Sequence, residues 1–149
     1  MVGDYKVITL CGSTKFKEQF MEVQKKLTLD GYIVISVGLF GHSGDDEVWS
    51  EGTKEMLDDM HKRKIDMADE IFVINVNGYI GSSTKSEIEY AHKTGKRVHY
   101  LVNCGMCQEF TGMGDWNLCC KNPPKDEFYP CGFLCYEDSP ACQNFKTKE

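Results

Sequence analysis

Ile71-Phe-Val-Ile-Asn-Val76 is the most strongly apolar run in the chain, and it predicts a buried β-strand. A second run, Tyr32-Ile-Val-Ile-Ser-Val37, shows little alternation of apolar with polar residues. This pattern is typical of strands that are covered on both faces, as in a parallel sheet. Apolar runs over 5–10 and 97–102 add a first and a last strand. Together these runs predict one parallel sheet.

Segments with the spacing of a helix separate the predicted strands. After the first strand, apolar residues recur every three or four positions, at Phe16, Phe20, Val23 and Leu27. A long helix is predicted from about 47 to 68, and another over 84–94, closed by Gly95. The long helix has an apolar stripe that we expect to pack in the core, made of Trp49, Met56, Met60 and Met67.

Strands that alternate with helices predict right-handed βαβ units. The expected fold is an α/β three-layer sandwich with a doubly wound, flavodoxin- or Rossmann-like parallel sheet in strand order 2-1-3-4. In that order the carboxyl ends of strands 1 and 3 meet at the switch point, where such sheets place their ligands. We expect this domain to cover residues 1–103 and a cysteine-rich, irregular C-terminal tail to cover 104–149.

Two polar loops leave the strands at this switch point. The first, Cys11-Gly-Ser-Thr14, precedes a helix, so its amides and hydroxyls could hold an anion; the alternative is a plain helix cap. The second, Gly81-Ser-Ser-Thr84, opens a helix whose first turn contains Glu87. Glu87 is either a site carboxylate or the far end of a capping box that Thr84 begins. Glu89 is expected to point into solvent.

The predicted long helix adds candidates near the same edge of the sheet. A strand of this length rises about 20 Å, which about 13 helical residues match. Counting back from Ala68 places several side chains near the ligand edge, namely Glu55, Asp58, Asp59 and His61. The alternative for Asp59 is an exposed ladder of ion pairs with Arg63 and Asp66. His42, in the loop after the second strand, is a further candidate.

Short motifs follow one another along the chain: Leu10-Cys-Gly-Ser-Thr14, then Ile65-Asp-Met-Ala-Asp-Glu-Ile-Phe-Val-Ile74, then Gly81-x-x-x-x-x-Glu87-Ile-x-x-Ala91 with Gly95-Lys-x-Val98. In this order they resemble the nucleoside 2-deoxyribosyltransferase superfamily, over about residues 5–102. Among its branches, the chain is most similar to the nucleoside 5′-monophosphate N-glycosidases.

The resemblance implies that Glu87 attacks C1′ of the sugar or stabilises the cation that forms there. It also implies that Gly12, Ser13, Ser82 and Ser83 hold a phosphate. The two loops would surround the substrate through Cys11, Gly12, Ser13, Thr14, Gly81, Ser82, Ser83 and Thr84. The family has an aspartate on the helix before strand 3, but a gap-free count reaches His61. We therefore expect Asp59, or its neighbour Asp58, to supply a proton to the leaving base.

The resemblance thus predicts an enzyme that cleaves or transfers at the N-glycosidic bond of a nucleoside or nucleoside 5′-monophosphate, as a homo-oligomer and with no cofactor for the chemistry. The alternative is a non-catalytic module that binds or senses a nucleotide or an ADP-ribose-like ligand. A formal charge of -6 argues against nucleic acid as a partner. Neither a membrane-spanning run nor a signal-peptide pattern is found, so a cytoplasmic protein without a membrane partner is expected.

The tail carries every cysteine except Cys11. Cys104-x-x-Cys107 and Cys131-x-x-x-Cys135 resemble the spacing of zinc ligands, and they predict a structural zinc site made of these side chains. The alternative is an appended segment that packs through its aromatic residues and keeps free thiols.

Overall fold

The computed structural model describes residues 1–41 and 50–102. The chain divides into two compact units. The first contains residues 1–74 and 80–99, and it holds nearly all the regular structure. In the second, the described part comprises 75–79 and 100–102, where the side-chain amide of Asn75 donates to the carbonyl of Val102 and accepts from its N–H.

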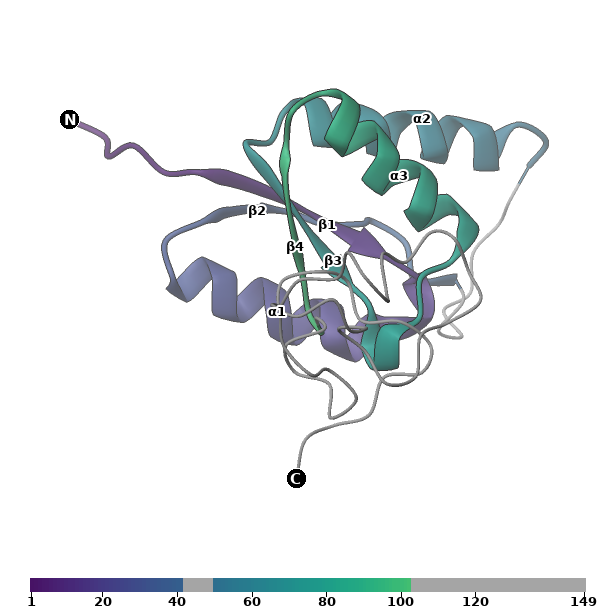
Figure 1. The fold of residues 1–149 in the computed structure, drawn as a ribbon, viewed down its shortest axis with the longest axis horizontal. Helices are drawn as coiled ribbons and strands as arrows, with labels where there is room; N and C mark the ends of the chain where they lie inside the picture. The colour runs from purple at the N-terminus through teal and green to yellow at the C-terminus, as the bar shows by residue number, and fades with distance from the viewer. Residues whose placement is uncertain (42–49, 103–149) are drawn as a thin grey trace, which may run out of the picture. The chain divides into compact units, whose positions relative to one another are not determined.

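A four-stranded sheet forms the centre of the first unit (Figure 1). Its strands are β1 (Val7–Gly12), β2 (Ile33–Ile35), β3 (Glu70–Ile74) and β4 (Arg97–Tyr100). The order is β2-β1-β3-β4, and β1 runs parallel to both β2 and β3. The predicted parallel sheet and its strand order are therefore confirmed, while β2 and β4 are shorter than the apolar runs that contain them.

Helices cover both faces of this sheet. Helix α1 (Lys17–Leu29) lies on one face, whereas α2 (Thr53–Asp66) and α3 (Ser82–Lys93) lie on the other (Figure 1). Short 3-10 turns are also present, at Thr14–Phe16 after β1 and at Val76–Gly78 after β3. In the part of the chain that is described, no helix is long and apolar enough to cross a membrane.

The core lies where the central strands meet the helices. The side chains of Leu10, Ile71 and Val73 are completely buried, as are Phe20 of α1 and Ile65 of α2. Burying a side chain of this kind stabilises the fold by about 1.5–3 kcal/mol relative to leaving it exposed. The strands are rich in β-branched and aromatic residues, and both faces of the sheet are covered, as the sequence predicted.

The predicted core stripe of the long helix is wrong. Met56, Met60 and Met67 are about half exposed, and Trp49 lies outside the described residues. Helix α2 instead turns His61 and Ile65 inward, four residues apart on one face. Neighbouring helical positions are about 100° apart, so burying His61 and Ile65 carries Met60 towards solvent. The inward face of α2 is therefore the one that carries His61, a polar side chain with partners on the sheet and on α3.

Candidate functional site

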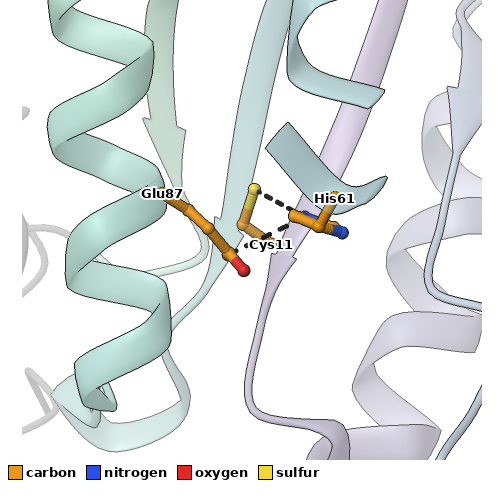
Figure 2. Close-up of side chains that lie close together, drawn as sticks. All are labelled: Cys11, His61 and Glu87. Carbon is orange, nitrogen blue, oxygen red and sulfur yellow. Dashed lines mark hydrogen bonds and ion pairs between the residues drawn. The ribbon is translucent and has the colours of Figure 1, made fainter. Parts of the chain in front are cut away.

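Cys11, His61 and Glu87 form a cluster of buried polar side chains (Figure 2). They come from β1, α2 and α3, three elements that are far apart in sequence. The Sγ of Cys11 lies 3.3 Å from Nε2 of His61, and the same nitrogen lies 3.7 Å from Oε2 of Glu87. Their sulfur, nitrogen and oxygen atoms all lie within 4.8 Å of one another.

Cys11 is the penultimate residue of β1, and its side chain is completely buried. The strand ends at Gly12, where φ is +151° and a Cβ atom would lie 2.9 Å from the carbonyl oxygen of Ile74. Such a separation is shorter than van der Waals contact allows, so only glycine lets β1 and β3 approach this closely at their carboxyl ends. The glycine thereby fixes where Cys11 lies relative to β3.

Glu87 points inward because it lies on the buried face of α3. Thr84, Ile88 and Ala91 are buried on this helix, and Glu87 follows Thr84 by three positions and precedes Ala91 by four. Its side chain is only 13% exposed. Glu89 is exposed, as predicted.

The capping-box alternative for Glu87 is excluded by the start of the helix. Helix α3 begins at Ser82, two residues earlier than predicted, with Gly81 at the N-cap and no side-chain capping bond. Glu87 therefore lies in the second turn, too far along the helix to return a bond to its end. Its carboxyl group instead faces Cys11 and His61.

His61 lies on α2 at the position where a gap-free count back from strand 3 looks for the aspartate of the family that the chain resembles. In the structure, His61 lies close to Glu87. Asp59 does not, because it is exposed on the outer face of α2. Asp58 is half exposed and forms an ion pair of 2.6 Å with Lys54. Glu55 is exposed in the first turn of the same helix.

Burial sets the protonation of the cluster. It raises the pKa of Glu87 from the usual 4.5 to about 8, against the lowering effect of a hydrogen bond from Cys11, while the charge of Asp58 raises it further. Burial also lowers the pKa of His61 to about 4, assisted by the charge of Lys64. The pKa of the Cys11 thiol is raised well above its usual value, mainly by burial and also by Glu87.

The separation of His61 and Glu87 would permit an imidazolium–carboxylate pair. Burial opposes it, because transferring two charges out of water costs several kcal/mol per ion. We therefore describe the cluster near neutral pH as a thiol, an uncharged imidazole and a protonated carboxyl group, in which the carboxylate is the minor form.

The two polar loops have different roles at their helix starts. Ser13 is the N-cap of the 3-10 turn, and its Oγ accepts a bond of 3.4 Å from the N–H of Lys15, so the plain-cap interpretation holds for Ser13. Ser82 and Ser83 are exposed at the start of α3, whereas Thr84 is buried. The N-cap of α3 is Gly81, which has no side chain that could cap the first backbone amides of the helix.

Three sequence-based predictions fall on residues outside the described ranges. They are the candidate His42, the structural zinc site of Cys104, Cys107, Cys131 and Cys135, and the irregular tail itself.

Nothing in the sequence predicts that Cys11 contacts a histidine. The resemblance places Cys11 in the substrate loop, and the length of the predicted helix places His61 only among several residues near the ligand edge. The signal that could have found His61 is its spacing of four residues from the apolar Ile65, on the one inward stripe of α2.

No protein-family model matches this chain, and no curated protein matches it.

Proposed function

We propose that this chain cleaves or transfers at the N-glycosidic bond of a nucleoside or nucleoside 5′-monophosphate, with Glu87 acting at C1′. The proposal places it with the nucleoside 2-deoxyribosyltransferase superfamily that its motifs resemble, in a flavodoxin- or Rossmann-like, doubly wound sandwich. One observation carries it: the Glu87 side chain is only 13% exposed, and it faces Cys11 at the carboxyl end of β1 instead of capping its own helix. Open α/β sheets place their ligands at this end of the strands.

The chemistry needs a negative charge beneath the anomeric carbon. Breaking a glycosidic bond passes through an oxocarbenium-like state, which a carboxylate can trap as a nucleophile or stabilise as a fixed charge. Glu87 supplies that charge in its ionised form. The ring nitrogen of His61 and the thiol of Cys11 lie against it and hold the carboxyl group in one orientation. We assign both as positioning residues.

The leaving base needs a hydrogen bond or a proton. We assign this task to Asp58 in preference to Asp59, because the charge of Asp58 acts on Glu87 whereas that of Asp59 acts on Tyr90. The first turn of α3 supports a phosphate-bearing substrate. Its uncapped amides and the exposed hydroxyls of Ser82 and Ser83 lie at the positive end of the helix dipole.

The test is product formation from a panel of nucleosides and nucleoside 5′-monophosphates, with and without a second free base, in buffer that contains a chelator. We expect the wild-type protein to release or exchange the base and Glu87→Gln to lose at least about 100-fold in turnover, since it keeps the shape of the side chain but cannot carry the charge. Glu89→Gln, on the exposed side of the same helix, is the matched control and should keep full activity.

A second candidate function is a module that binds a nucleotide or an ADP-ribose-like ligand without catalysis. The raised pKa of Glu87, about 8, favours it, because most of the nucleophile is protonated at neutral pH. In that case wild type and Glu87→Gln would bind the ligand with similar affinity, and neither would release base at pH 7 or at pH 9. The enzyme would instead release base faster as the pH rises towards 8.

The remaining parts of the proposal follow the resemblance. We propose a small-molecule nucleoside or nucleotide as the substrate, a homo-oligomer as the active form, the cytoplasm as the location, and no cofactor in the glycosidic step itself.

A further inference from the structure

The same side chains form a set of metal ligands. Cys11 offers sulfur, His61 offers nitrogen and Glu87 offers oxygen, and these are the donor types that bind Zn²⁺ in proteins. We propose that Cys11, His61 and Glu87 bind one Zn²⁺ ion, with the fourth position left for water or another small ligand. This inference does not depend on the proposed function, because it concerns binding and can be read without any measurement of activity.

The distances fit a tetrahedral ion. Zinc bonds of about 2.3 Å to sulfur and about 2.0–2.1 Å to nitrogen and oxygen set the ligand atoms about 3.3–3.6 Å apart. The separations of 3.3 Å from Cys11 to His61 and 3.7 Å from His61 to Glu87 lie within ~0.4 Å of that geometry. The third separation, from the sulfur of Cys11 to the carboxyl group of Glu87, is within 4.8 Å, so Glu87 has to move closer to the sulfur when the ion binds.

The charges balance. On binding, Cys11 gives its thiol proton to solvent and ligates as a thiolate, Glu87 gives up its carboxyl proton to solvent and ligates as a carboxylate, and His61 stays uncharged. Two negative ligands and one Zn²⁺ leave no net charge in a buried place. Burial therefore opposes the metal-bound cluster far less than it would oppose an isolated thiolate or carboxylate.

The ligands are held in place before any metal arrives. Each comes from a different element of the first unit, and each of these elements is anchored by buried neighbours, such as Leu10 on β1, Ile65 on α2 and Ile88 on α3. A preformed site does not have to recover the cost of ordering flexible side chains. Glu87 is the most exposed ligand, at 13%, and so provides the side from which an ion can enter.

Zinc binding would also affect the proposed reaction. A carboxylate that ligates Zn²⁺ shares its lone pair with the metal and cannot at the same time attack C1′. Zinc and substrate would then exclude each other, so the chain would be inhibited by Zn²⁺ and reactivated by a chelator.

The experiment measures bound metal in full-length chains that have been stripped with a chelator and reloaded with excess Zn²⁺. Wild type is compared with Cys11→Ser, His61→Ala and Glu87→Gln by equilibrium dialysis and elemental analysis. We expect each substitution to remove one zinc per chain, or to weaken it at least ~100-fold, since even outer-shell partners are worth 10–100-fold. Glu89→Gln and Asp59→Asn, on the exposed sides of α3 and α2, are matched controls that should keep it.

The cysteine-rich tail requires a second background, because its thiols would bind the same metal. The measurement is repeated in a full-length chain with the tail cysteines replaced by serine, at Cys104, Cys107, Cys119, Cys120, Cys131, Cys135 and Cys142. In that background, Co²⁺ should give a near-ultraviolet thiolate-to-cobalt band that disappears in Cys11→Ser. Circular dichroism of each variant shows whether it is folded, and Glu87→Gln, the closest in shape, decides the matter if Cys11→Ser does not fold.

One result would overturn the proposal: an equal zinc count in wild type and all three ligand variants, together with no cobalt band in the background without tail cysteines. That outcome would assign all bound metal to the tail. It would leave the proposed function standing, just as an inactive wild type that binds zinc through Cys11 would leave this inference standing.

Discussion

At the scale of single residues, the proposed chemistry depends on how far Glu87 is removed from water. Its carboxyl group meets a thiol and an uncharged imidazole. A carboxyl group in such surroundings keeps its proton well above its usual pKa, as carboxylic acids in apolar active sites do. The same surroundings make the ionised form of Glu87 the minor one near neutral pH.

We predict that Glu87 makes stability depend on pH. Its folded pKa of about 8 lies above the unfolded value of 4.5, so the unfolded chain releases this proton first as the pH rises. The wild type should therefore lose stability between about pH 4.5 and pH 8, by up to a few kcal/mol, whereas Glu87→Gln should not. Urea unfolding of both proteins at pH 5, 7 and 9 with a chelator present measures the difference. Parallel pH profiles for the two proteins would contradict the burial argument.

At the scale of elements, α2 determines which side chains reach the site. One face of this helix carries a stripe of methionines and another carries His61 and Ile65. The face with His61 and Ile65 is the one that packs against the sheet. Ile65 fills the core, and the carbonyl of Lys64 accepts a hydrogen bond of 2.9 Å from Thr9 on β1. These contacts fix the rotation of α2 about its axis, and that rotation places His61 over Cys11.

A pair of alanine substitutions tests this orientation. Ile65→Ala should cost about 2–5 kcal/mol, because it removes a completely buried side chain and leaves a cavity. Met60→Ala, on the half-exposed stripe of the same helix, should change the free energy of unfolding by less than about 1 kcal/mol. Chemical denaturation of the two variants side by side gives both values. Equal losses would mean that the methionine stripe is buried after all.

At the scale of the whole first unit, the two ends of the parallel strands carry different groups of side chains. The carboxyl end of β1 holds the Cys11–His61–Glu87 cluster, whereas the amino end of β3 is tied to its neighbours by charged groups. Buried Glu70 accepts a bond of 3.1 Å from Lys6, just before β1, and a close hydrogen bond from His99 on β4. Asp69 accepts a bond of 2.8 Å from the backbone N–H of Val7.

The hydrogen bonds to Glu70 predict a second dependence of stability on pH, opposite in sign to that of Glu87. Burial alone would raise the pKa of Glu70, but the hydrogen bonds and charges of His99 and Lys6 outweigh it and lower the pKa below 4.5. The carboxylate therefore stabilises the fold above that pH and loses its contribution as the pH falls through the lowered pKa. Glu70→Gln should be less stable than wild type at pH 6, and the gap should shrink by pH 3. Thermal unfolding across that range measures the gap, and a constant gap would show that the loss is one of shape and not of charge.

The sequence by itself determined the strands and their order, and it singled out Glu87 as a candidate. The unalternating run of β3 and the Gly-Ser loop after β1 are local signals, and local signals are enough to predict a parallel sheet in which the carboxyl ends of β1 and β3 lie side by side.

Only the tertiary structure decided which face of α2 turns inward and which partners Glu87 has. Periodicity shows which residues share a face of a helix, but it cannot show which face the sheet will accept. A buried histidine needs polar partners, and here they come from β1, fifty residues before it, and from α3, after it. The chain had to fold before a thiol, an imidazole and a carboxyl group could lie within bonding distance of one another.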